Sequence, residues 1–225
     1  MSRLDIRAIG ELFQLFAVVA LLLFLPAGTL DFWQAWAYLA VFFGTAIAVT
    51  RYLEVHDPDL LERRRRGGPT AETERTQKLI MALATAGSVA MVVIAGLDRR
   101  FGWSSVPPAV SLASDIAFLL GYALIFLVFR VNSFAAATIA LAPDQTVIST
   151  GPYAIVRHPM YLGGLVIIGA TPVALGSWWA ALCLVPLLAV FIWRLLDEEA
   201  FLRQNLQGYD GYCQSVRFRL VPYLW

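Results

Sequence analysis

A charged and aromatic stretch between two long apolar runs contains one of the two histidines of the chain. The stretch spans 149–161 and includes Arg157, His158 and Tyr161. Pro159 suits the first turn of a helix, where its missing N–H costs nothing, and it pushes His158 toward an extended conformation. A helix start offers free N–H groups and a partial positive charge to a carboxylate or phosphate. We therefore expect an anion-binding helix start with these side chains around it.

A second charged group lies further along, near the end of one long helix predicted over 178–207. Arg194 and Glu198 are four residues apart and share a helical face, with Glu199 about 100° round the helix from Glu198. One interpretation is an ordinary ion pair, which contributes a few tenths of a kcal/mol when solvated. The other is a charged wall that faces the histidine cluster. Paired charges at a membrane boundary favour this functional interpretation.

The composition indicates a membrane protein. The chain has 225 residues, of which 59% are hydrophobic, and its mean hydropathy is +0.68. Several apolar runs approach the ~20 residues that cross a bilayer. The fold class is therefore all-α, a multi-pass transmembrane helical bundle of about six spans. The predicted spans are 12–28, 32–53, 79–97, 109–129, 160–176 and the helix from 178.

Other binding functions find no support in the sequence. The basic residues flank apolar spans and form no aromatic-laced polar face, so nucleic-acid binding is not expected. Cys183 and Cys213 have no metal-ligand spacing, and we expect neither a metal site nor a disulfide between them. Within the fifth predicted span, Gly163, Gly164 and Gly169 allow close contact with another helix.

The distribution of basic residues predicts the orientation. With six spans and the N-terminus inside, only Arg99 and Arg100 of the 17 lysines and arginines fall outside. This asymmetry indicates that both termini are cytosolic. Both charged groups then lie on the same cytosolic face, where helix ends and the C-terminal tail can form one site.

The longest polar stretch of the front half contains four consecutive arginines, at 63–66. Such runs beside a span usually orient the protein and contact lipid phosphates, and we favour this interpretation. The alternative is a clamp for an anionic substrate. His56 lies in the same juxtamembrane region and receives no role.

The pattern Gly-Pro-Tyr-x-x-x-Arg-His-Pro-x-Tyr-x-Gly at 151–163 resembles the signature of the isoprenylcysteine carboxyl methyltransferases and the related phospholipid methyltransferases. A second block agrees in order and spacing. It comprises Arg194-x-x-x-Glu-Glu-x-x-Leu, then Gly208-Tyr-x-x-Tyr, then Arg217-x-Arg-Leu-x-Pro. The resemblance implies N-terminal transmembrane helices and a basic loop over 1–109, followed by a catalytic region over 110–225.

The resemblance also implies S-adenosylmethionine as cofactor and a lipid-linked acceptor that enters sideways between helices. The implied cofactor-binding residues are Tyr153, Arg157, His158, Pro159, Tyr161, Glu198 and Glu199. Arg194 and Glu198 are the implied catalytic residues, and Asn132 and Arg217 are candidates for substrate binding. Tyr209 and Tyr212, with Tyr153, have the chemistry to contact ribose or adenine.

Chemistry supports these assignments without fixing the acceptor. The sulfonium and α-amino group favour carboxylates and aromatic faces, whereas the methionine carboxylate favours the helix start with His158 and Tyr161. An ionised carboxylate acceptor needs no general base, but an amine would, and Glu198 could assist it. The front half shows no acceptor-recognising motif, so a small lipid, amine or thiol is as suitable as a prenylated protein.

Two other interpretations remain open. The tail 212–223 is also similar to the end of membrane sterol reductases, which use NADPH, but no clear basic site for a 2′-phosphate is present. The Gly-Pro-Tyr start and the adjacent glutamates favour the methyltransferase. An inert membrane scaffold would bind no cofactor, and mutation of His158 or Glu198 would affect only packing.

Overall fold

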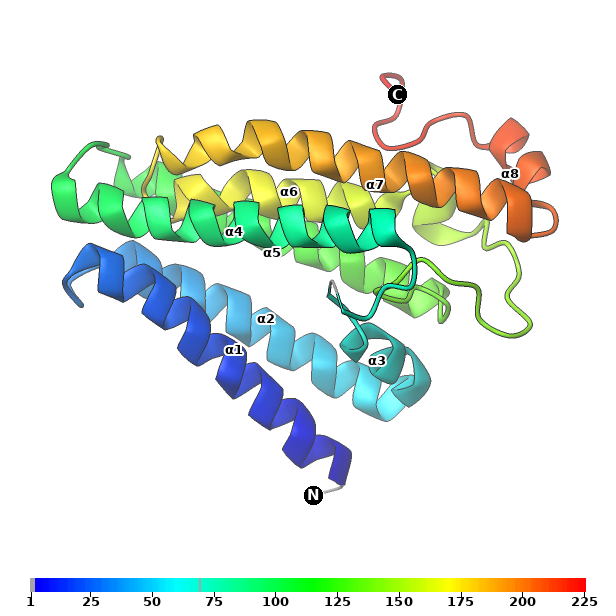
Figure 1. Ribbon diagram of the computed structural model, residues 1–225, viewed down its shortest axis with the longest axis horizontal. Coiled ribbons are helices and arrows are strands. Elements are labelled where there is room, and N and C mark those ends of the chain that lie inside the picture. The colour runs from blue at the N-terminus through cyan, green and yellow to red at the C-terminus, as the bar shows by residue number, and fades with distance from the viewer. Residues whose placement is uncertain (1–2, 69) are drawn as a thin grey trace.

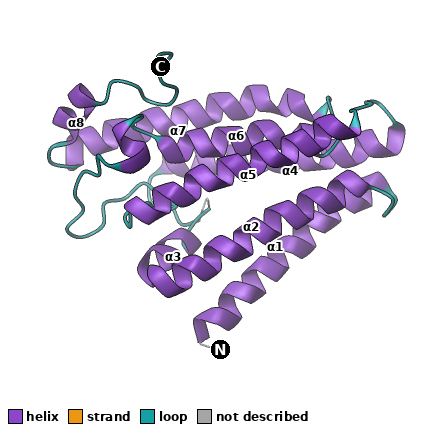
Figure 2. Cartoon of the chain, turned by 180° about the vertical axis from the view of Figure 1, so that it is seen from behind, coloured by secondary structure: helices purple, strands orange, loops and turns teal. Residues whose placement is uncertain are grey.

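The computed structural model describes residues 3–68 and 70–225, and within these ranges the chain is helical without strands (Figures 1 and 2). The described part has five segments long and apolar enough to cross a membrane. They lie in α1 (Arg3–Ala27), α2 (Trp33–His56), α4 (Arg75–Phe101), α5 (Pro108–Val131) and the continuous pair η2 (Ala180–Cys183) and α7 (Leu184–Asn205). These long apolar helices are those of an integral membrane protein.

The fifth predicted span is a shorter apolar helix. Helix α6 (Pro159–Ala174) has 16 residues, about 24 Å at 1.5 Å per residue, against a bilayer core of about 30 Å. It begins at Pro159, as the sequence predicts, and ends before Gly176, whose φ is +76°. The predicted helix over 178–207 is also subdivided, since a 3₁₀ turn precedes α7.

Two short helices are missing from the sequence-based prediction, one after α2 and one in the C-terminal tail. Helix α3 (Pro58–Arg65) follows α2 and carries most of the arginine run. The Asp57 side chain accepts a hydrogen bond from the Leu60 N–H at 2.9 Å, and Pro58 fills the first helical position. Asp followed by Pro is a recognisable helix start, so a local signal for α3 was present.

Glycines bring α5 and α6 into their close contact. A Cβ on Gly163 would lie 2.8 Å from the carbonyl oxygen of Gly121, and one on Gly121 would lie equally close to the Gly163 oxygen. The two backbones therefore touch directly, as small residues allow between membrane helices. Gly169, on the same helix, has nothing within 4 Å of the position of a Cβ.

This contrast gives a prediction about stability. Gly163→Ala is expected to destabilise the fold by about 1–3 kcal/mol, because the α5 backbone cannot yield as a side chain would. Gly169→Ala, the matched control, is expected to be neutral or slightly stabilising, since alanine favours helix more than glycine does. Thermal unfolding of both purified variants in the same detergent compares them. Equal melting temperatures would contradict direct backbone contact.

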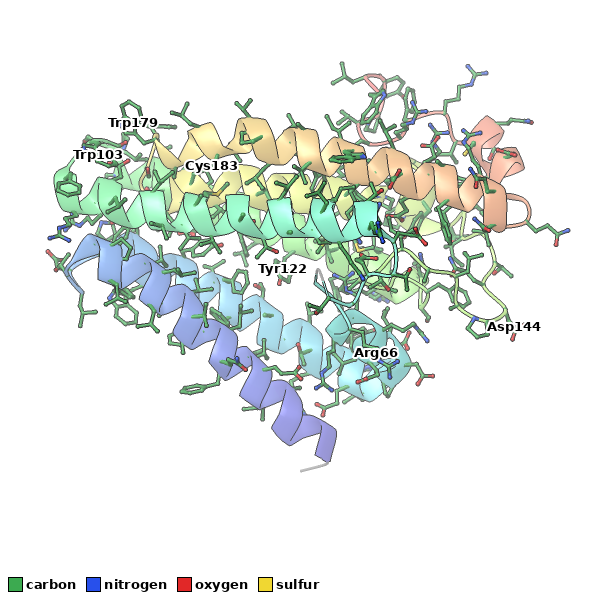
Figure 3. All side chains as sticks on the ribbon, in the orientation of Figure 1. Arg66, Trp103, Tyr122, Asp144, Trp179 and Cys183 are labelled. Carbon is green, nitrogen blue, oxygen red and sulfur yellow. The ribbon has the colours of Figure 1, made fainter. Side chains whose placement is uncertain are left out.

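The two ends of the bundle differ in chemistry. Figure 3 shows Trp103 and Trp179 at one end and Arg66 and Asp144 at the other. Tryptophans favour the membrane–water interface. The end with Arg66 also carries α3, the 3₁₀ turn η1 (Gly151–Ala154), α8 (Tyr209–Ser215) and the longest loop (Figures 1 and 2). The two charged groups found in the sequence therefore meet at one end of the bundle.

Candidate active site between two helix ends

A cavity of about 420 Å³ lies at this polar end, within the roughly 300–1,000 Å³ usual for small-molecule sites. Its polar lining consists of Arg64, Asn132, Tyr153, Arg157, His158, Tyr161, Arg194, Glu198, Tyr209 and Tyr212, together with polar groups of the 138–146 loop. Its apolar lining includes Met81, Ala84, Ile125, Gly164, Ile168 and Phe191 from helices α4 to α7. The structure thus gathers most of the expected site residues around one cavity whose other half lies among membrane helices.

The signature segment is held in place by the C-terminal tail. The backbone N–H of Arg157 donates to the carbonyl of Phe218, and that of His158 donates to the carbonyl of Arg219, both at 2.9 Å. His158 occupies the N-cap position of α6 without a capping side-chain hydrogen bond. His158 lines the cavity at the start of the helix, and the adjacent Pro159 is buried.

Glu199 is a buried anchor outside the cavity wall. Its carboxylate lies 2.9 Å from Arg219 Nε, 3.1 Å from Arg203 and 3.6 Å from Arg157. His158 Nε2 approaches it to 3.5 Å, which is long for a hydrogen bond. Glu199 does not line the cavity, so the structure shows it contacting residues that do. Its cofactor-binding role stays a prediction from the sequence.

Three polar atoms of cavity-lining residues have no hydrogen-bond partner among the described residues. They are Arg157 Nε, His158 Nε2 and the Tyr209 hydroxyl, and all three are buried. Buried polar atoms are nearly always paired in native proteins. Because their residues line the cavity, these atoms are candidates for contact with a polar ligand there.

Glu198 supplies the only carboxylate in the described lining of the cavity. The Tyr161 hydroxyl donates to it at 2.5 Å, and this bond joins the start of α6 to α7. No described lysine, arginine or histidine forms an ion pair with Glu198, which lies beside the heavily paired Glu199. Its negative charge is therefore available to a cationic ligand.

Aromatic hydroxyls and an amide complete the polar half of the cavity. Asn132 Nδ2 donates to the Tyr153 hydroxyl at 2.8 Å, and the Tyr212 hydroxyl donates to the backbone carbonyl of Tyr153 at the same distance. Burial raises the pKa of Tyr153 to about 12, so its hydroxyl stays protonated at neutral pH and can donate to a ligand. Burial likewise raises the pKa values of Tyr209 and Tyr212.

Arg194 is held by residues that the sequence analysis missed. It donates to Glu72 and to Gln77 at 2.8 Å each and to the Ala137 carbonyl at 2.9 Å. Glu72 and Gln77 are buried. Arg194 therefore pairs with Glu72 and forms no ion pair with Glu198. A lone glutamate in a polar loop gives no sequence signal for this partnership.

The contact between Glu72 and Arg194 predicts energetic coupling. Glu72→Gln and Arg194→Met are each expected to destabilise the protein, because each leaves a poorly solvated charge behind. In the double variant the losses should fall short of their sum by about 0.5–3 kcal/mol. Thermal unfolding of the four proteins measures this coupling. Strict additivity would show that the two side chains do not interact in the folded protein.

Two further arginines depart from the sequence expectation. Arg217, a candidate for substrate binding, is exposed and does not line the cavity, whereas Arg219 bonds Glu199. Arg64, from the run assigned to orientation, lines the cavity. Burial lowers the pKa of Arg64, although arginine keeps its charge in proteins.

The fold and this site define a class of protein, namely an integral membrane protein with a polar small-molecule cavity at one end of its helical bundle. Residues 110–207 match the model of the phospholipid methyltransferase family, which confirms the resemblance found in the sequence. This match supports a membrane methyltransferase in general and gives no support to a reductase. No curated protein matches the chain significantly.

Proposed function

We propose that the protein transfers a methyl group from S-adenosylmethionine to a lipidic or membrane-embedded acceptor. The observation that carries the proposal is the cavity itself. It combines an available carboxylate, Glu198, with unpartnered buried atoms of Arg157, His158 and Tyr209. S-adenosylmethionine is positively charged at its sulfonium and amino group and negatively charged at its carboxylate, so both kinds of group find complementary partners.

The residues of the cavity fit the cofactor group by group. Arg157, His158 and the N–H groups at the start of α6 suit its carboxylate. Glu198, oriented by Tyr161, suits a cationic group. The tyrosine hydroxyls and Asn132 have the hydrogen-bonding capacity for a ribose or an adenine. These roles match the residues that the family resemblance implies.

The bound cofactor supplies a methyl group activated by the sulfonium charge. The protein's contribution is to orient the reactants and to exclude water. Arg194 and Glu198 are the proposed catalytic residues, because both line the cavity between its polar and apolar halves. Glu72 and Gln77 position Arg194, and Tyr161 positions Glu198. A carboxylate acceptor would need no base, whereas an amine could lose its proton with help from Glu198.

The apolar half of the cavity supports a lipidic acceptor. Met81, Ile125, Ile168 and Phe191 come from four helices of the membrane bundle. An apolar chain can enter between these helices while its reactive end meets the polar residues. An isoprenylcysteine carboxylate and related lipid, amine or thiol acceptors fit this description. The distribution of basic residues supports a site on the cytosolic face.

The transfer can be tested with S-adenosylmethionine that carries a tritiated methyl group. The purified protein is incubated with this cofactor and a total membrane lipid extract, and organic-phase label is counted. We expect label to accumulate with the wild type and to fall to background with Glu198→Gln. If the wild type binds the cofactor but leaves the organic phase unlabelled, a lipidic acceptor is contradicted.

A further inference from the structure

The charges that line the cavity are unequally paired. Three described arginines and one glutamate contribute to its wall. Arg157 lies 3.6 Å from Glu199, and Arg194 lies 2.8 Å from Glu72, so both of these cations have a carboxylate beside them. Among the described side chains, Arg64 has no carboxylate within 4 Å. Glu198 and Arg64 are therefore the carboxylate and the guanidinium of the described lining that form no direct ion pair.

Neutral groups hold Arg64 in its place. Its Nη1 donates to the Ala136 carbonyl at 3.0 Å and contacts the sulfur of Met160 at 3.6 Å. The guanidinium carbon lies 5.2 Å from the centre of the Phe129 ring, within the range of a cation–π contact. These contacts hold the guanidinium in place without a carboxylate in direct contact with it.

Arg64 lies where the polar and apolar halves of the cavity meet. Met160 is in the first turn of α6, close to His158. Phe129 is one helical turn from Ile125, which belongs to the apolar lining. A group bound at Arg64 therefore has the proposed cofactor residues on one side and the membrane-facing half of the cavity on the other.

We propose that Arg64 binds an anionic head group on the methyl acceptor, so that the protein selects anionic amphiphiles over cationic or neutral ones. This inference rests on the proposed function, because Glu198 and the signature residues are assigned to the cofactor. A positively charged acceptor head would face Arg64 and Arg194 in a cavity with a single available carboxylate. An anionic head, either a carboxylate or a phosphate, would neutralise the remaining cation.

Arg64 lies outside the region that matches the family model, since the match begins at residue 110. The arginine run therefore serves two purposes along α3. Arg65 pairs with Glu11 and Glu62, and Arg66 pairs with Glu62 near the surface, whereas Arg64 reaches the cavity. A purely structural role would make Arg64 a tether between α3 and α6 without influence on ligand choice.

Binding of four amphiphiles with the same chain and different heads distinguishes these roles. The probes are dodecanoate, dodecyl phosphate, dodecylamine and dodecanol, titrated into the protein in phosphatidylcholine nanodiscs. We expect the wild type to bind dodecanoate or dodecyl phosphate at least tenfold more tightly than it binds dodecylamine and dodecanol. The carboxylate and phosphate arms identify which anion is preferred.

The variants are Arg64→Leu, Arg64→Gln and Arg64→Lys, with Arg66→Leu as the matched control from the same run. The proposal is supported if Arg64→Leu or Arg64→Gln loses the preference for anionic heads. Arg64→Lys should restore part of this preference, and the Arg66→Leu control should retain it. Equal binding of all heads by the wild type, or an unchanged preference in both neutral variants, would overturn it. If Arg64→Leu fails to fold, the head-group preference of Arg64→Gln decides between the two roles.

S-adenosylhomocysteine binding is measured in the same preparations and separates the two proposals. We expect its affinity to change less than about twofold in Arg64→Gln. Absence of binding to the wild type would reject the proposed cofactor, whereas the head-group preference would still decide the role of Arg64. Equal losses of both kinds of binding in Arg64→Gln would assign Arg64 to the cofactor and overturn the inference.

Discussion

Glu198→Gln is expected to lower the affinity for S-adenosylmethionine at least tenfold while leaving the protein folded. The substitution preserves the shape of the side chain, and the amide oxygen can still accept the hydrogen bond of Tyr161. Only the charge disappears. Because Glu198 is the one carboxylate in the described lining of the cavity, no neighbour can replace its attraction for a cation. A tenfold loss corresponds to about 1.4 kcal/mol, a modest value for a partly desolvated ion pair.

The comparison of two ligands sharpens this prediction. S-adenosylhomocysteine lacks the sulfonium charge, so its affinity should fall less than that of S-adenosylmethionine. Calorimetric titration of both ligands measures the difference, and Glu74→Gln, which alters an exposed carboxylate, is the control. Equal and small losses for both ligands would place the cationic groups of the cofactor away from Glu198.

Glu199→Gln is expected to have the largest effect on stability. Glu199 is buried and contacts Arg157, Arg203 and Arg219, together with His158 at 3.5 Å. Removing its charge leaves cations of the signature and the tail uncompensated. Breaking a buried ion pair in this way typically costs about 3–5 kcal/mol. We therefore expect a melting temperature many degrees lower, with loss of cofactor binding as a consequence of the disturbed site.

The matched control for Glu199→Gln is Asp210→Asn. Asp210 also pairs with Arg203, at 2.8 Å, but its side chain is 66% exposed, and such pairs contribute about 0–1 kcal/mol. Thermal unfolding with and without S-adenosylhomocysteine measures both variants. If Glu199→Gln melted like the wild type and only failed to bind the ligand, Glu199 would be a ligand contact and the anchoring role would be wrong.

The adjacent glutamates show how far the sequence determines the site. The sequence predicts that Glu198 and Glu199 lie on a charged wall facing the signature segment. The family resemblance assigns both to the cofactor. A rotation of about 100° along a helix separates them, and the packing of the tail decides which one faces the cavity. Glu198 lines it, whereas Glu199 lies outside the lining and pairs with three arginines. Sequence spacing alone carries no information on this rotation.

The membrane spans were predictable because they depend on local composition. The long apolar runs and the helix start at Pro159 agree with the structure. The partners of Arg194 were not predictable. Glu72 and Gln77 meet it only because α4 and the loop before it pack against α7. Arg64 was likewise not predictable, because it belongs to a run of four arginines whose other members do not line the cavity. Such contacts between distant segments leave no periodic pattern in a single sequence.

The proposed methyltransferase activity requires that the cavity between the signature segment and α7 binds S-adenosylmethionine. This binding can be measured by calorimetric titration of the purified wild type and His158→Ala with S-adenosylhomocysteine, and with NADPH in parallel. We predict saturable binding of S-adenosylhomocysteine at a one-to-one ratio, its loss in His158→Ala, and no binding of NADPH. If a folded His158→Ala variant bound S-adenosylhomocysteine undiminished, or the wild type did not bind it, the cavity would not be the cofactor site.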